Sequence, residues 1–139
     1  MSRWTCPRCD REFGRARQSH DCLPGNSVEA TFRGRPPEQR AIYDAILAFL
    51  QSIGPVHEDA VQVGVFLKVD RKLAELRPKS KWLSCNLYLP HAIDDARVAR
   101  SLRLSSTRVL SEVKVRRADE VDDQLCAWLS EAYDAATEQ

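Results

Sequence analysis

Four residues of the types that bind zinc lie close together near the N-terminus. Cys6 and Cys9 are separated by two residues, and His20 and Cys22 follow after ten more. Two cysteines at this spacing can point into one tetrahedral site from a tight turn, and thiolate and imidazole are preferred zinc ligands. Because a closed Cys3His set leaves no position for water, the pattern predicts a structural zinc ion rather than a catalytic one.

Two other interpretations of these cysteines remain open. The pair Cys6 and Cys9 has the spacing of a thioredoxin-like redox motif, although no strand precedes it as that motif requires. The cysteines could also be simple thiols, but a polar segment of this length cannot bury a core and would then have nothing to fold around. The short spacing between His20 and Cys22 remains compatible with zinc, since an extended chain places residues i and i+2 on one side.

A second group of residues has the chemistry to contact an anion. Cations flank a predicted turn at residues 78–80, and an aromatic residue follows it. A cationic rim beside an aromatic side chain suits phosphate pairing and base stacking. The predicted nucleic-acid-binding residues are Arg71, Lys72, Arg77, Lys79, Lys81 and Trp82. In the alternative interpretation Trp82 lies beneath a helix and the lysines only solvate the hairpin.

An enzymatic interpretation starts from Glu112 and Lys114. On a predicted strand this E-x-K pair projects to one face, as in restriction-type nucleases, where an upstream aspartate completes a metal site. Asp94 and Asp95 lie upstream. Because E-x-K also occurs by chance on exposed strands, we keep a metal-dependent nuclease as an alternative and assign no catalytic residue.

The elements that would position these residues follow from hydrophobic periodicity. Apolar residues at helical spacing predict a helix over 37–53 and another over 119–137, and an aspartate cap predicts a short helix from Asp94 or Asp95 to Leu102. Period-two patterning predicts strands over 61–69, 72–77, 81–89 and 108–116. We therefore expect an α+β fold with an antiparallel sheet of about four strands and packed helices.

The expected organisation is a zinc-binding knuckle over residues 1–23, a linker over 24–36 and one α+β domain over 37–139. A length of 139 residues with 43% hydrophobic residues suits a single domain with a real core. No apolar run approaches the ~20 residues needed to span a bilayer, and the N-terminus has no apolar signal region. We expect a cytoplasmic protein with no membrane partner, in a compartment where cysteines stay reduced or bind metal.

Charge is unevenly distributed along the chain, although the net charge is only +1. Residues 61–117 contain 13 basic and 5 acidic residues, whereas residues 118–139 contain 7 acidic residues and no basic one. A basic middle region is typical of a surface that meets an anion, although acidic helices packed beside it could neutralise it.

Several segments resemble an uncharacterised bacterial family, domain of unknown function 5655. The resemblance lies in residues 4–22, 36–53, 76–83 and 120–125. It implies an α+β domain behind a small Cys/His segment, with no established activity, and fusions of related domains to nuclease-like modules favour a nucleic-acid context. Relatives carry histidines near the fourth predicted strand, where this chain has residues 108–113 without one.

Together these patterns favour a non-enzymatic binding module that carries structural zinc and contacts DNA or RNA through a basic sheet or hairpin surface. A protein-interaction or small-ligand-binding module is the first alternative, and a metal-dependent nuclease-like enzyme is the second.

Overall fold

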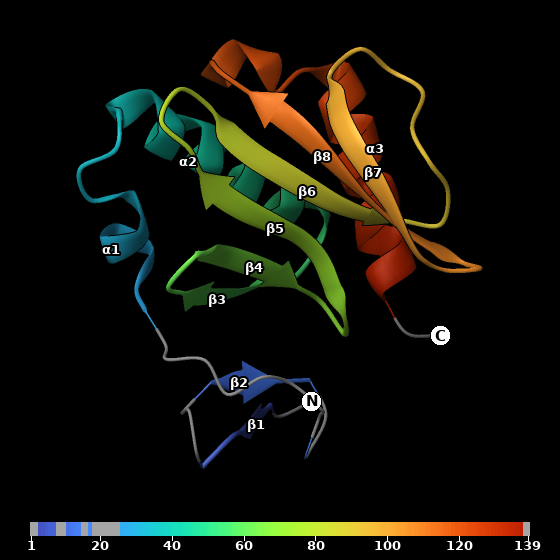
Figure 1. Ribbon diagram of the computed structural model, residues 1–139. Helices are drawn as coiled ribbons and strands as arrows, with labels where there is room; N and C mark the ends of the chain where they lie inside the picture. The colour runs from blue at the N-terminus through green and yellow to red at the C-terminus, as the bar shows by residue number, and fades with distance from the viewer. Residues whose placement is uncertain (1–2, 8–10, 15–16, 18–25, 138–139) are drawn as a thin grey trace.

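The computed structural model describes residues 3–7, 11–14, 17 and 26–137. A six-stranded antiparallel sheet forms its centre, with strand order β3-β4-β5-β6-β8-β7 (Figure 1). The strands are β3 His57–Val61, β4 Gly64–Lys68, β5 Lys72–Pro78, β6 Leu83–Leu89, β7 Val98–Ser105 and β8 Arg108–Val115. The α+β class is as expected, but the sheet has six strands rather than about four.

Two helices cover one face of this sheet: α2 Pro37–Ile53 and α3 Asp123–Ala136 (Figure 1). Helix α2 begins after Pro36, ends at Ile53 before Gly54, and buries Ile42, Ile46 and Leu50 completely. These residues recur every fourth position and form one stripe on the helix, which is the pattern that predicted it. The core therefore lies between the two helices and the sheet.

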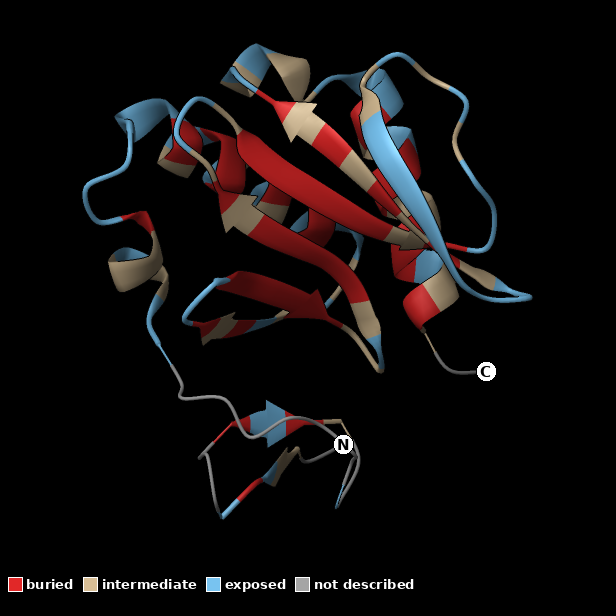
Figure 2. Ribbon diagram, viewed as in Figure 1, coloured by how far each residue is buried: buried red, intermediate tan, exposed pale blue. Residues whose placement is uncertain are grey.

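The sheet contributes every second residue of its strands to this core. In β6 the odd positions from Leu83 to Leu89 are fully or almost fully buried (Figure 2). In β8 the odd positions Val109, Val113 and Val115 are buried as well. Period-two alternation thus sends one set of side chains to the helices and leaves the other set on the opposite face.

The segment 61–69, predicted as one strand, is instead part of a hairpin. Strand β3 ends at Val61, residues 62–63 form the turn, and β4 starts at Gly64, which pairs with Val61. Because Val61 pairs with Gly64 and Ala60 with Val65, Val61 faces the opposite side of the sheet from Val65 and Leu67. The run of aliphatic residues at odd positions therefore crosses the turn without following one face, and it resembles a single strand only in the sequence. Glycine is required at position 64, because a Cβ atom there would lie 2.3 Å from the Leu76 carbonyl oxygen.

The short helix predicted from Asp94 or Asp95 to Leu102 is wrong, because residues 98–105 form strand β7. Asp95 does cap a local structure, but it is a turn, in which its carboxylate accepts a hydrogen bond from the Arg97 amide at 2.8 Å. Strand β7 is an edge strand that is mostly exposed (Figure 2). Its stabilisation comes from backbone pairing with β8, which leaves little hydrophobic pattern in the sequence.

The remaining elements are short or shifted relative to expectation. A five-residue helix, α1 Val28–Phe32, lies within the predicted linker, and its Phe32 packs on Tyr43 with ring centroids 5.2 Å apart. The C-terminal helical region is divided into a 3-10 turn, η1 Ala118–Glu120, and α3. Asp122 separates them by accepting a hydrogen bond from the Leu125 amide at 3.0 Å. Of the helices described, none is long and apolar enough to cross a membrane.

Near the N-terminus two short strands, β1 Trp4–Thr5 and β2 Glu12–Phe13, form a second, two-stranded sheet. Trp4 pairs with Phe13, and the Cys6 amide donates to the Arg11 carbonyl at 2.9 Å, which closes the hairpin. We call the described part of this unit, residues 3–7 and 11–14, the N-terminal hairpin.

Candidate functional site

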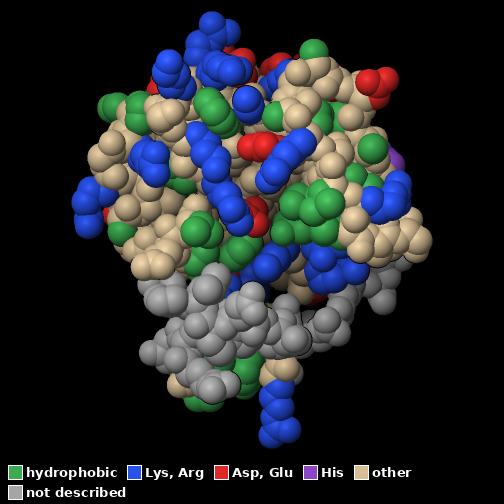
Figure 3. Space-filling model, in the orientation of Figure 1, with side chains coloured by type: hydrophobic (Ala, Val, Ile, Leu, Met, Phe, Trp, Pro, Cys, Tyr) green, Lys and Arg blue, Asp and Glu red, His purple; other side chains and the backbone are tan. Residues whose placement is uncertain are grey.

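The sheet face opposite α2 and α3 carries the polar half of the strand residues, and we call it the open face. Its side chains stand in registered rows across the strands. One row consists of Arg77, Ser84 and Lys114, and the next includes Glu75, Asn86 and Glu112. Figure 3 views this face and shows Lys and Arg side chains lying across it with acidic side chains between them.

Trp82 lies on the open face directly before β6. Its indole N–H donates to Ser84 Oγ at 2.9 Å, and Lys114 Nζ lies 4.3 Å from the ring centroid. The Arg116 guanidinium is 6.0 Å from the same ring. Trp82 therefore lies on strands and under two cations from β8 and its C-terminal extension, rather than beneath a helix. Cation–π contact holds these positive charges above a flat aromatic surface.

Glu112 and Lys114 project to the same face, as the E-x-K pattern predicted. The Glu112 carboxylate accepts a hydrogen bond from Ser84 Oγ at 2.6 Å and lies 3.5 Å from Arg100 Nε. The Asp95 carboxylate accepts a hydrogen bond from the Arg97 amide in the turn before β7. Within the part of the chain that the structure describes, no three His, Cys, Asp or Glu side chains converge to hold a metal ion.

A shallow cavity of about 170 Å³ opens on this face between β6, β8 and β7. Asn86 and Glu112 supply polar groups, while Leu102 and Leu110 supply apolar walls. Its residues also include Arg100 and Ser101. A cavity with a polar floor and apolar sides suits a flat, polar-edged group such as a nucleobase.

The six residues predicted to bind nucleic acid do not form one patch. Arg71 and Lys72 lie where β5 begins, whereas Arg77, Lys79, Lys81 and Trp82 lie near its end. The six residue steps of β5 place these groups ~20 Å apart at the rise of an extended strand. Proximity in the sequence therefore concealed a separation along the strand.

Other cations of the open face come from β7, β8 and the residue after β8. Arg100, Arg108, Lys114 and Arg116 were not among the predicted binding residues. The signal was present in the sequence, because the even positions from 108 to 116 alternate with buried valines and must share a face. Their proximity to Trp82 depends on pairing of β6 with β8, which skips β7 and was not predicted.

The N-terminal hairpin docks on the open face over β3 and β4. Arg11 donates to both oxygens of the Asp59 carboxylate, at 3.1 and 2.8 Å, and Lys68 Nζ lies 2.6 Å from the same carboxylate. All three side chains are at least 95% buried. Phe13 is also buried, and Lys68 Nζ lies 4.3 Å from its ring centroid. The hairpin is thus joined to the sheet by a buried, charge-paired contact.

Asp59 is kept ionised by this arrangement. Burial alone would raise the pKa of its carboxyl group, but hydrogen bonds and charge from Arg11 and Lys68 outweigh burial and lower the pKa below its usual 3.8. Burial lowers the pKa of Lys68, against the opposing effect of Asp59. A bidentate guanidinium–carboxylate pair is strong and directional, so it fixes the orientation of the hairpin.

Of the predicted zinc ligands, only Cys6 falls within the described residues. It is buried and lies directly after β1, at the start of the connection to β2. Cys9, His20 and Cys22 lie outside the described residues, so the structure does not test the proposed ligand set.

The comparisons with known proteins identify a family. The model of Domain of unknown function (DUF5655) matches residues 28–136, which is most of the chain. The chain belongs to this family. The match starts at α1 and ends at the last residue of α3, so the family domain is the six-stranded sheet with its helices, without the N-terminal hairpin. No curated protein and no solved structure matched.

Proposed function

We propose that this member of the DUF5655 family binds nucleic acid on the open face of its sheet. The observation that supports this proposal most directly is the Trp82 cluster, in which Lys114 and Arg116 lie over an indole ring on that face. A single strand offers both phosphates for the cations and bases for stacking, so it matches this combination better than a duplex does.

The arrangement of the face suggests how a strand would bind. Phosphates would pair with Arg77, Lys114 and Arg116 at one end of the strands and with Arg100 on β7. A base could enter the cavity beside Asn86 and Glu112. Both central acids are already engaged, Glu75 with Arg77 and Glu112 with Ser84 and Arg100, which limits their repulsion of a phosphate.

Salt dependence of binding tests this proposal. The affinity of a fluorescent single-stranded oligonucleotide is measured by anisotropy at several salt concentrations. Each phosphate contact contributes a slope of about −0.7 in log K against log salt for single strands. The K114E/R116E variant should bind more weakly, and its slope should be shallower by about 1.4 because two contacts are lost.

A matched control is available in the connection between α1 and α2. Arg33 and Arg35 are exposed there, whereas the two cations over the Trp82 ring are Lys114 and Arg116. R33E/R35E makes the same change in net charge as K114E/R116E. Equal effects of the two variants would mean that binding follows total charge rather than the open face. Salt-insensitive binding, or none, would contradict the proposal.

We also propose that the N-terminal segment holds one structural zinc ion through Cys6, Cys9, His20 and Cys22. The support is the Cys3His pattern together with the buried position of Cys6 in a closed hairpin. A zinc ion here would stabilise a unit whose described part has only two two-residue strands. Metal analysis of untagged protein tests this, with about one zinc per chain expected and its loss in H20A/C22A.

A protein partner is the second candidate, because β7 exposes Leu102 and Leu104, 59% and 45% of whose surface is accessible. An exposed edge strand can pair with another extended chain. Such binding would depend little on salt, so the titration described above separates it from phosphate binding.

A further inference from the structure

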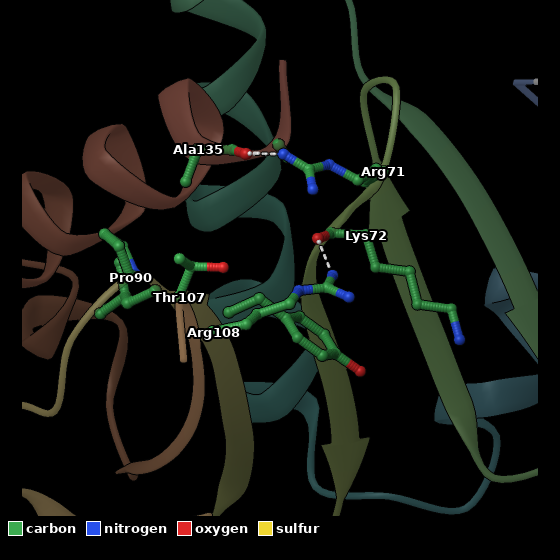
Figure 4. Close-up of a pocket in the computed structure, with 9 residues that line it drawn as sticks. Arg71, Lys72, Pro90, Thr107, Arg108 and Ala135 are labelled. Carbon is green, nitrogen blue, oxygen red and sulfur yellow. Dashed lines mark hydrogen bonds between the residues drawn. The ribbon is translucent and has the colours of Figure 1, made fainter. Parts of the chain in front are cut away.

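A second cavity, of about 220 Å³, lies at the end of the sheet remote from Trp82. Its walls come from the start of β5, the end of β6, the start of β8 and the end of α3. Figure 4 shows Arg71 and Arg108 on either side of it, with the Thr107 hydroxyl directed toward the space between them. Lys72 belongs to the wall, but its ammonium group points away and lies 4.0 Å from the Phe66 ring centroid.

Both guanidinium groups are fixed by backbone carbonyls. Arg71 Nη2 donates to the Ala135 carbonyl at 2.8 Å, and Arg108 Nη2 donates to the Lys72 carbonyl at 3.0 Å (Figure 4). Arg108 also lies over the Tyr88 ring, 4.3 Å from its centroid. Each guanidinium has five N–H donors, so these bonds orient the group and leave other donors available. Both side chains are therefore ordered before a ligand binds, which reduces the conformational entropy lost on binding.

The charges in this cavity are unbalanced. None of the residues that line it is acidic. Partial burial lowers the pKa of Arg108, the Tyr88 ring opposes this effect, and the positive charge of Arg71 lowers the pKa further. Two like charges that repel each other in a recess gain stability when an anion enters between them.

We propose that this cavity binds the phosphate monoester group of an organic ligand. Two guanidinium groups and a hydroxyl provide donors for the three terminal oxygens of a phosphate, whereas a carboxylate has only two oxygens. The two positive charges match a phosphate that carries close to two negative ones near neutral pH. Leu89, Pro90 and Ala136 form an apolar wall for the organic part of the ligand.

This cavity is separate from the Trp82 cluster, because Arg71 and Arg108 lie at the opposite end of the strands from Lys114 and Arg116. The shared chemistry has two sources: a small phosphorylated metabolite, or the terminal phosphate of a nucleic-acid strand. A phosphodiester inside a strand carries a single charge and has two terminal oxygens, so it fits the cavity less well.

Titration calorimetry with phenyl phosphate, inorganic phosphate and benzoate tests the proposal. Phenyl phosphate should bind most tightly, since it has both the dianion and an apolar body. The R108Q and R71Q variants should each bind about tenfold or more weakly, which corresponds to the loss of one charge-assisted hydrogen bond. Arg103 provides the matched control, because it lies in the same β7–β8 hairpin, donates hydrogen bonds to the Ser105 and Ser106 carbonyls, and does not line the cavity.

Wild-type affinity in R103Q combined with loss in R71Q and R108Q would support the site. If R108Q does not fold, R108K replaces it, because lysine keeps the positive charge but lacks the planar guanidinium with its paired donors. Weaker phenyl phosphate binding by both R108K and R71Q would then support the site. Phenyl phosphate binding no tighter than benzoate, or equal binding by R71Q and wild type, would overturn the proposal.

The two sources are separated with one oligonucleotide prepared with a 5′-phosphate and with a 5′-hydroxyl. A preference for the 5′-phosphate that disappears in R108Q assigns the site to strand ends, and equal binding assigns it to a small metabolite. The K114E/R116E variant should bind phenyl phosphate normally, so failure of the open face and failure of this cavity give different results.

Discussion

Removal of the Asp59 carboxylate should detach the N-terminal hairpin from the sheet. In Asp59→Ala, Lys68 loses the carboxylate 2.6 Å from its ammonium group and Arg11 loses a bidentate partner. Removing one partner of a buried ion pair typically costs ~3–5 kcal/mol, because the other charge stays buried without compensation. In this protein the loss in free energy of unfolding is limited, because the hairpin can undock and return Arg11 and Lys68 to water.

The size of the effect therefore measures how strongly the hairpin is docked. We expect the free energy of unfolding in urea to fall by about 2–4 kcal/mol, somewhat below the full penalty for a broken buried pair. Hydrogen exchange of the Arg11–Phe13 backbone should become much faster even in the absence of urea. The amide protons of α2 should keep their protection, because its core contacts are unchanged.

Asp44→Ala is the matched control, because Asp44 forms an exposed pair with Arg40 one turn away on α2. An exposed i,i+4 pair contributes only about 0.3–0.5 kcal/mol. If Asp59→Ala and Asp44→Ala had equally small effects and hairpin exchange were unchanged, the buried network would not hold the hairpin, and our reasoning would be refuted.

Three other predictions concern pH, packing and metal. The lowered pKa of Asp59 means that its contribution is present above the ordinary carboxyl pKa of 3.8 and is lost as pH falls through the lower folded value; hairpin exchange should accelerate only in that acidic range, and Asp59→Asn should remove the transition. Gly64→Ala should lower the melting temperature markedly, because the added Cβ would lie 2.3 Å from the Leu76 carbonyl oxygen; a variant as stable as wild type would contradict the tight β4–β5 approach. Chelation of the proposed zinc ion should speed hairpin exchange while Cys85 stays unreactive toward thiol reagents, since burial raises its pKa to about 12; rapid Cys85 labelling would show that the whole domain had opened.

Strong periodicity made part of the fold predictable. Helix α2 and strands β6 and β8 each send one regular apolar stripe to the core, so their type and approximate bounds follow from the sequence. The elements that were missed lack such a stripe. Strand β7 pairs by its backbone at an exposed edge. The aliphatic residues at odd positions run on through the β3–β4 turn, although Val61 and Val65 face opposite sides of the sheet.

The candidate site was predictable in type but not in position. The sequence indicated cations beside Trp82, and two cations do lie over that ring. They are Lys114 and Arg116, about 30 residues further along the chain, whereas Arg71 and Lys72 lie at the opposite strand ends. Which cations meet depends on β6 pairing with β8, and that order is set by long-range packing that no local pattern reports.

The low net charge of +1 does not argue against an anionic ligand. The acidic residues of the C-terminal region lie on η1, on α3 and beside them, in the layer behind the sheet, whereas Lys114 and Arg116 lie over Trp82 on the open face. Packed layers are separated by roughly 10 Å, which is close to the distance over which physiological salt screens exposed charges. At that salt the helix charges should cancel the field above the open face only weakly. At very low salt the Debye length is longer and screening is weaker, so the cancellation should grow, and phosphate affinity should rise less steeply there than contact number alone predicts.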